Sequence, residues 1–173
     1  MKTEAQEISS IEQLLGYASA MEREAAIRYT ELAQAMEQHN NQDVAELFRR
    51  LADIEWVHAH HMGQMLDELS ISPELATRPP QEALNSAEVP DAGELHYLYQ
   101  PYHAIDLARK YEQRSAEFYA QLACTSANEE LRTMALSFAA EEQAHLEELE
   151  QWLKRYPKPF EDWDDDPDPP AEQ

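Results

Sequence analysis

The distribution of proline constrains the fold of this sequence more than any other feature. All ten prolines lie either between residues 73 and 101 or between residues 157 and 170. The stretches 1–72 and 102–156 contain none. Because proline removes a backbone N–H and clashes inside a helix, proline-free stretches of this length predict two long helical regions.

Each proline-free stretch is interrupted once by polar residues that favour turns. Residues 37–43 read EQHNNQD, and residues 124–130 read CTSANEE. In the second break, Ser126 and Glu129 have the spacing of a capping box, which predicts the start of a helix there. Because both breaks are short, each stretch is expected to fold as an antiparallel helix pair. The sequence therefore predicts four helices, at roughly 10–38, 43–69, 101–124 and 127–155.

The remaining two segments are rich in proline. Segment 70–100 is long enough to run the length of a helix bundle and to join the second helix to the third. We therefore predict that residues 1–156 form one all-α four-helix bundle with a long crossover. Residues 157–173 contain five prolines and seven acidic residues, a composition that predicts a disordered tail.

The two helical stretches also repeat one another, which predicts a pseudo-symmetric bundle. Five positions of the first helix correspond to positions of the third at a constant offset of 90, and four positions of the second correspond to the fourth at an offset of 87. The first set is Ala18, Glu22, Tyr29, Leu32 and Ala33 with Ala108, Glu112, Tyr119, Leu122 and Ala123. The second set is Leu51, Ala52, Glu55 and His58 with Phe138, Ala139, Glu142 and His145.

A few polar residues lie on the predicted inner face of each helix, where steps of four and three residues mark a buried seam. The first and third helices each place one Glu there. The second and fourth each place a Glu followed three residues later by a His. The six residues are Glu22, Glu55, His58, Glu112, Glu142 and His145. Since apolar residues lie on both sides of each along its seam, all six are predicted to face the core.

Four inward carboxylates need a counter-charge, because unpaired carboxylates buried together would cost several kcal/mol each. None of the four seams carries a Lys or Arg. Two divalent cations would balance the four charges, and a mixture of carboxylate and imidazole suits iron, manganese or zinc.

The overall net charge of −22 argues against nucleic acid or an anionic membrane as a partner, because both bind basic patches.

Four short motifs carry a resemblance to a known group of proteins. They are LADIEWVH at 51–58, FAAEEQAH at 138–145, EREAAIRY at 22–29 and EQRSAEFY at 112–119. With these motifs, residues 10–156 resemble the ferritin-like diiron-carboxylate superfamily and, within it, the rubrerythrin-like proteins. A carboxylate from each of two helices with a Glu-x-x-His pair from each of the other two is the stated ligand pattern of such bundles.

The resemblance implies two iron ions, each with its own Glu and His, and two further Glu residues that bridge both. The individual ligands are Glu22 with His58 and Glu112 with His145, and the bridging residues are Glu55 and Glu142. These six are therefore candidate catalytic residues as well as metal ligands. Members of the group reduce hydrogen peroxide or react with oxygen by cycling the pair between ferrous and ferric states. Rubrerythrins also carry an extra carboxylate about one turn after the third-helix ligand, where this sequence has Ser115.

Rubrerythrin proper carries a carboxyl-terminal rubredoxin domain, where this sequence has its acidic tail. With a single cysteine and no CxxC pair, the sequence predicts no rubredoxin-type site, so an external electron donor is expected. Two alternatives stay open: a ferroxidase that stores or delivers iron, and a metal-free interaction module. An oxidoreductase of this type is expected to be a homodimer, whereas a cage would favour iron storage.

Several other residues allow more than one interpretation. Tyr29 and Tyr119 either donate hydrogen bonds to the ligand carboxylates or serve as core aromatics. His60 and His61 lie off the seam and are expected at the surface. The segment HYLYQPYH at 96–103 is interpreted as packing of the crossover against the bundle. Because the amino terminus lacks the apolar run of a signal peptide, a cytoplasmic location is expected.

Overall fold

The computed structural model describes residues 8–71 and 96–164, and these form an all-α bundle. Its helices are α1 (Ile11–Gln38), α2 (Gln42–Glu68), α4 (Pro101–Thr125) and α5 (Glu129–Leu153). The bounds agree with the predicted helices to within two residues at every end. No strand occurs in the described ranges.

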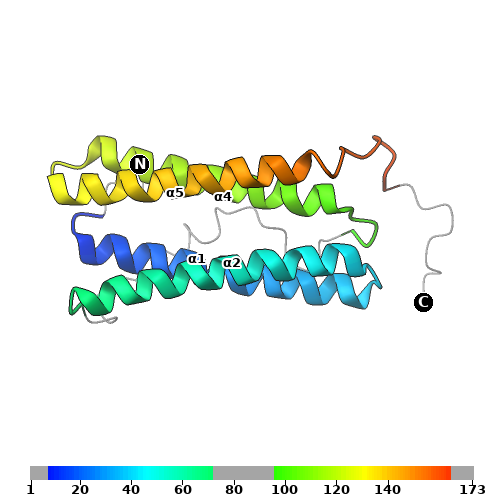
Figure 1. Cartoon of the computed structure of the whole chain (residues 1–173), viewed down its shortest axis with the longest axis horizontal. Helices are drawn as coiled ribbons and strands as arrows, with labels where there is room; N and C mark the ends of the chain where they lie inside the picture. The colour runs from blue at the N-terminus through cyan, green and yellow to red at the C-terminus, as the bar shows by residue number, and fades with distance from the viewer. Residues whose placement is uncertain (1–7, 72–95, 165–173) are drawn as a thin grey trace.

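Figure 1 shows two antiparallel helix pairs lying side by side. The helices α1 and α2 pack along each other, as do α4 and α5, whereas contact between the pairs is sparse. The helix α2 ends at the left of the bundle and α4 begins at the right, so the end of α2 and the start of α4 lie toward opposite ends. The path of the predicted crossover stays a prediction, because residues 72–95 lie outside the described part of the chain.

Polar side chains cap three of the helices. Ser10 accepts a hydrogen bond from the Gln13 amide at the start of α1. Asn41 caps α2, and its amide nitrogen also donates to the carbonyl oxygens of Tyr97 and Tyr99, at 3.3 and 2.6 Å. Asn41 thereby ties the α1–α2 turn to the residues that precede α4.

The predicted capping box at Ser126 and Glu129 is wrong. The cap of α5 is Asn128, whose side-chain oxygen accepts hydrogen bonds from the amides of Glu130 and Leu131. The Ser126 hydroxyl instead accepts from the amide of Asn128, at 3.1 Å. Asn and Ser are about equally good caps, so spacing alone could not choose between them.

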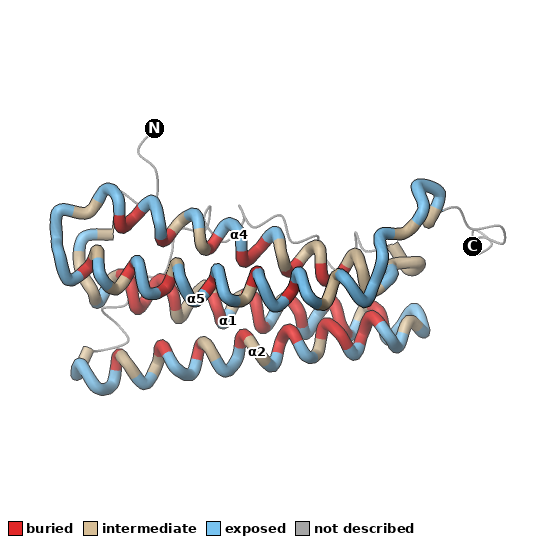
Figure 2. The backbone as a smooth tube through the Cα atoms, turned by 45° about the horizontal axis from the view of Figure 1, so that its top comes forward, coloured by how far each residue is buried: buried red, intermediate tan, exposed pale blue. Residues whose placement is uncertain are grey.

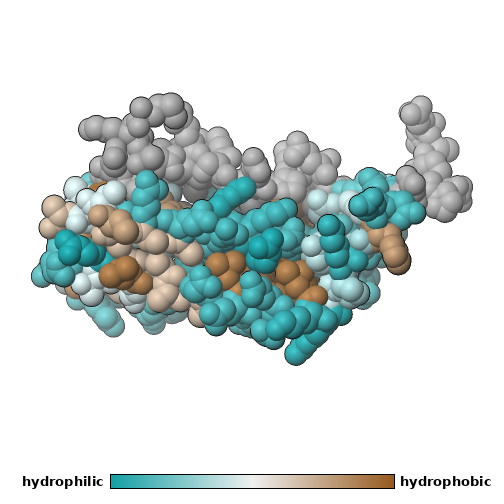
Figure 3. Space-filling model, turned by 90° about the horizontal axis from the view of Figure 1, so that it is seen from above, coloured by the Kyte–Doolittle hydropathy of each residue, from teal (hydrophilic) through white to brown (hydrophobic). Residues whose placement is uncertain are grey.

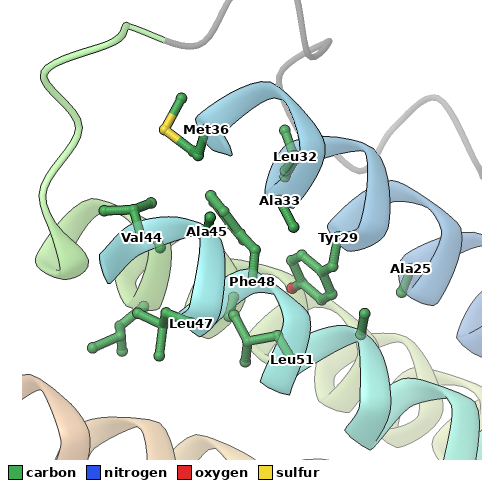
Figure 4. Packing of buried hydrophobic residues seen from close by; sticks show 14 of the residues in the cluster. Ala25, Tyr29, Leu32, Ala33, Met36, Val44, Ala45, Leu47, Phe48 and Leu51 are labelled. Carbon is green, nitrogen blue, oxygen red and sulfur yellow. The ribbon is translucent and has the colours of Figure 1, made fainter. Parts of the chain in front are cut away.

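The core consists of two apolar clusters at different heights along the bundle. The first joins the carboxyl-terminal half of α1 to the amino-terminal halves of α2 and α4; Figure 4 shows Tyr29, Phe48 and Leu51 packed within it. The second joins the amino-terminal end of α1 to the far ends of α2 and α4 and the start of α5. Figure 2 shows buried positions recurring along the inner sides of the helices. Between the two clusters lies a central band of polar residues.

One residue of the predicted tail, Trp163, packs against the segment around the start of α4. The Trp163 ring lies against His96, Tyr99 and His103, with ring centroids 5.4, 5.5 and 4.0 Å away. The segment 96–103 is therefore in contact with the chain end, in addition to its hydrogen bonds with Asn41. Disorder of the tail stays a prediction for residues 165–173, which lie outside the described residues.

The surface is dominated by polar groups. The face in Figure 3 is mostly hydrophilic, with apolar residues in separate small groups. Across residues 8–71 and 96–164, the structure contains no helix that is both long and apolar enough to cross a membrane.

Candidate metal centre

The central band contains the only buried carboxylates of the described residues, one from each helix. Each lies near the middle of its helix, where the apolar seam of the first cluster gives way to that of the second. Their exposed fractions are 6% or less. The four residues are Glu22, Glu55, Glu112 and Glu142. The seam pattern therefore predicted correctly which acidic residues turn inward.

One group of possible ligands comes entirely from the α1–α2 pair. Glu22, Glu55 and His58 each offer one ligand atom, and these atoms lie within 4.8 Å of one another. The Nδ1 atom of His58 is 3.9 Å from Oε2 of Glu22 and 3.5 Å from Oε2 of Glu55. Glu55 and His58 are three residues apart on α2, so one helical turn brings them to the same side. We call this group the first triad.

The second triad repeats this arrangement on the α4–α5 pair. Glu112, Glu142 and His145 also bring their ligand atoms within 4.8 Å of one another. The Nδ1 atom of His145 lies 3.5 Å from Oε2 of Glu112 and 3.5 Å from Oε2 of Glu142. The internal repeat of the sequence is thus a repeat of a three-residue site.

The two triads face each other across the interface between the helix pairs. The imidazole rings of His58 and His145 stack with their centroids 4.3 Å apart. The structure therefore brings all six predicted residues to one place, and the two clusters suggest a dinuclear metal site. It groups Glu22 with His58 and Glu112 with His145, as the sequence analysis did. Bridging by Glu55 and Glu142 stays a prediction.

The electrostatics of the band favour the neutral form of two of its acids. Burial, followed by the charge of Glu55, raises the pKa of Glu22 well above its usual value. Burial also raises the pKa of Glu112 well above its usual value, although the neighbouring His145 imidazole acts to lower it. No Lys or Arg of the described residues is buried. The band therefore has no protein cation with a permanent charge to balance its carboxylates. A bound metal ion would supply the missing positive charge.

At His145 and Glu142, the other two members of the second triad, the pKa shifts favour the charged form. Burial alone would lower the pKa of His145, but the carboxylates of Glu112 and Glu142 raise it to about 10. Burial alone would raise the pKa of Glu142, but the neighbouring His145 imidazole and Glu112 bring it below its usual value. Without a metal, this triad holds a proton on the imidazole and a charge on Glu142.

The Nδ1 atom of His145 supports occupation by a metal ion. This atom is buried and makes no hydrogen bond, since the Oε2 atoms of Glu112 and Glu142 both lie 3.5 Å away, beyond ordinary hydrogen-bond length. A buried polar atom without a partner is costly. An ion between the three side chains would satisfy this nitrogen and the carboxylate oxygens together, so the residues present fit a divalent cation.

The two predicted supporting tyrosines lie beside the band and are almost fully buried. Tyr29 packs against Phe48, and Tyr119 packs edge-on against Phe138. Burial and the nearby carboxylates raise the pKa of both hydroxyls well above the usual value. The hydroxyl of Tyr29 makes no hydrogen bond, so the bond expected from it to a ligand carboxylate is not formed here. A hydrogen-bonding role for either tyrosine stays a prediction.

Other histidines of the described chain lie away from the band. His60 and His61 are exposed on α2, as expected from their position off the seam. His96 and His103 contact Trp163. None of these four belongs to a group of three possible ligands in the described residues.

Sequence reasoning missed two features near the triads. The Tyr111 hydroxyl donates to the carbonyl oxygen of Met21, at 3.1 Å, and so links α4 to α1 beside Glu22 and Glu112. Ile54 and Trp152 line a small cavity that reaches the triads. Trp152 also packs against the first apolar cluster. Helical periodicity identifies a buried face of this kind but does not show where a cavity interrupts it.

Comparisons with known proteins agree with this site. The crystal structure of an uncharacterised conserved protein from Magnetospirillum magnetotacticum MS-1 is similar, with 36% sequence identity and a TM-score of 0.62; the match covers 87% of this chain and 98% of that chain. No curated protein matches the chain. Residues 13–153 match the family model described as rubrerythrin and so include all six candidate ligands. The chain therefore belongs to the rubrerythrin family.

Proposed function

We propose that the chain is a non-haem diiron oxidoreductase that reduces hydrogen peroxide or reacts with oxygen. The observation that carries the proposal is the pair of Glu-Glu-His triads, which lie face to face with four buried carboxylates and two half-buried, stacked imidazoles, and without a buried Lys or Arg in the described residues. Membership of the rubrerythrin family supports the same reaction class.

Charge balance supports two divalent ions in place of one. Four carboxylates carry four negative charges when ionised, and two neutral imidazoles add none, so two divalent ions bring the site to neutrality. A single divalent ion would leave two buried charges uncompensated, which the low dielectric of a protein interior penalises. The equal composition of the triads also favours one ion at each.

Iron is the proposed metal because the reaction transfers electrons, which zinc cannot do. A pair of iron ions would supply two electrons by passing from the ferrous to the ferric state, and peroxide takes up these two electrons and two protons to give two molecules of water. The protein itself orients the reacting groups and keeps water away from them. The apolar clusters on both sides of the band exclude water from the carboxylates.

The Tyr29 hydroxyl is suited to hold a proton beside the site. It is buried, it has no hydrogen-bond partner, and its raised pKa keeps it protonated at neutral pH. It can therefore donate a hydrogen bond to an oxygen atom at the triads without giving up its proton. Tyr119 occupies the corresponding position of the repeat and is buried to the same extent.

The reducing electrons are proposed to come from an external donor. The 173 residues contain one cysteine, Cys124, whereas a rubredoxin-type iron site needs four. A homodimer and a cytoplasmic location stay predictions; size-exclusion chromatography separates a dimer from the large cage that iron storage would require.

The proposal is tested by loading the protein with Fe²⁺ without oxygen and mixing it with peroxide or oxygen in a stopped-flow spectrometer. Peroxide should oxidise the ferrous form faster than oxygen does. The matched control is the His58→Ala/His145→Ala variant, which should show neither reaction. Equal rates, or faster reaction with oxygen, would favour the ferroxidase alternative. Failure of the parent protein to bind iron would favour the metal-free interaction module.

A further inference from the structure

A small cavity connects the surface to the two triads between α2 and α5. Its lining includes Glu55, Glu112 and His145, one candidate ligand from each of three helices. The cavity therefore reaches both triads. The larger cavity beside Trp56 and His60 on α2 contacts none of the six candidate ligands.

Most residues at the sides and mouth of the cavity are not ligands. Leu51 and Leu149 are buried and form apolar walls. Ile54, Trp152 and the His145 imidazole are half-buried and Glu148 is exposed, so these four residues mark the side of the cavity that faces solvent.

The size of the cavity restricts what can pass. Its volume is about 20 Å³, and about 10–15 Å³ is needed to hold one water molecule. Hydrogen peroxide and dioxygen each have two heavy atoms and are close to this size. An organic hydroperoxide with an aromatic or branched alkyl group is several times larger. The wall also disfavours charged species, because desolvating an ion in an apolar passage is costly.

The mouth of the cavity lies between two helices whose backbones do not pack closely against each other. The helices α2 and α5 belong to different pairs, and contact between the pairs is sparse. Side chains therefore decide how far the gap is closed. The Trp152 ring packs against the first apolar cluster, which holds it in place at the opening.

We propose that this cavity is the route by which the oxidant reaches the metal pair, and that Trp152 with Ile54 sets its size limit. The route admits small neutral molecules with two oxygen atoms and excludes bulky organic hydroperoxides. This inference rests on the proposed function, since it concerns the oxidant of the same site. Trp152 and Ile54 act as residues that determine specificity, and neither touches the reacting atoms.

The test compares two oxidants on variants that widen or close the mouth. Trp152→Ala should raise the rate of ferrous oxidation by cumene hydroperoxide, relative to hydrogen peroxide, by about tenfold or more, in the range that a change of one side chain in a pocket produces. Ile54→Trp should slow both reactions. Trp56→Ala is the matched control, because Trp56 is an exposed tryptophan of α2 outside this cavity. If Trp152→Ala does not fold, Trp152→Leu should shift the ratio in the same direction.

A second readout does not depend on turnover. Association of nitric oxide with the ferrous protein should be slowed about tenfold or more by Ile54→Trp, with iron content unchanged, and should be unaffected by Trp56→Ala. If neither oxidant reacts but nitric oxide shows this dependence, the proposed function fails and the route stands. If oxidation proceeds at rates and ratios that Trp152→Ala and Ile54→Trp do not alter, the route is overturned. A parent protein that binds no iron would overturn both.

Discussion

The imidazole rings of His58 and His145 are nearly parallel, with their planes 6° apart and their centroids separated by 4.3 Å. One ring belongs to α2 and the other to α5. The stack is thus a direct contact between the two triads, across an interface at which the helix pairs touch little. Replacing either ring would remove a candidate ligand and also the contact that aligns the opposite ring.

We predict that the protein binds two iron ions per chain, because each triad offers the same three ligands. Elemental analysis after anaerobic loading and desalting measures this directly. The His58→Ala/His145→Ala variant should lose both ions. The His60→Ala/His61→Ala variant should keep both, because these histidines are exposed and lie off the site. A parent value that saturates near one ion would contradict the dinuclear assignment.

The unfolding free energy of the metal-free protein should fall as the pH rises from about 5 to about 10. The folded-state pKa values of Glu22 and Glu112 lie well above 4.5, and that of His145 rises from 6.5 to about 10. Over this range the folded chain therefore binds more protons than the unfolded chain, which makes stability decrease with pH. The lowered pKa values of Glu142 and His103 act in the other direction, but Glu142 does so only below about pH 4.5 and His103 only below about pH 6.5. The three raised groups outweigh the single histidine over the range.

Metal affinity should change in the opposite direction with pH. An ion has to displace the protons held by Glu22, Glu112 and His145, so its binding should strengthen as the pH rises. Denaturant melts in chelator and metal titrations, both at about pH 6 and about pH 9, give the two trends. Metal-free stability that increases with pH would show that these groups do not hold the protons assigned to them.

Replacing all six candidate ligands with apolar residues of similar size should leave the metal-free fold at least as stable as the metal-free parent. Exchanging buried charged groups for packed apolar groups is often neutral or stabilising, by about 1–4 kcal/mol. Denaturant melts of both proteins in chelator make the comparison, and the variant should also lose peroxide reduction. A variant that unfolds much more easily would mean that the six residues hold the bundle together by pairing with one another.

Removing the Trp163 ring should loosen the chain end without affecting the metal site. Trp163→Ala should cost about 1 kcal/mol, since aromatic pairs contribute about 0.5–1.5 kcal/mol beyond area burial. Burial lowers the pKa of His103, so exposing this ring should raise its pKa in an NMR titration. Phe160→Ala is the control, because Phe160 is 88% exposed; an equal effect of both variants would argue against the contact.

The sequence was sufficient to predict the helices and the six inward residues because both depend on periodicity. A carboxylate at a seam position such as Glu55 has no other direction to face once the apolar residues on either side of it are buried. The internal repeat supplied an independent check, since Glu55 and Glu142 occupy equivalent positions. Local pattern and tertiary packing agree throughout the bundle, as they do when a sequence specifies one fold.

The features that were not predicted depend on distances between elements. The cavity beside Trp152 exists because the side chains of α2 and α5 do not fill the gap between the helices. Such a gap cannot be predicted from the periodicity of the sequence. The contact of Trp163 with His103 joins residues 60 positions apart through a few aromatic rings. The helix α5 is capped by Asn128 and not by Ser126. Both residue types are good caps, so their spacing in the sequence could not show which of them caps the helix.

The confinement of each triad to one helix pair has a consequence for how the chain folds. The contacts within a pair are mainly between neighbouring segments, and contacts of this kind form quickly. Each hairpin can therefore assemble its own three ligands before it meets the other hairpin. The late step is docking, which brings four carboxylates together and is opposed by their mutual repulsion. Divalent cations should accelerate this late step, so that refolding with metal is faster than refolding in chelator.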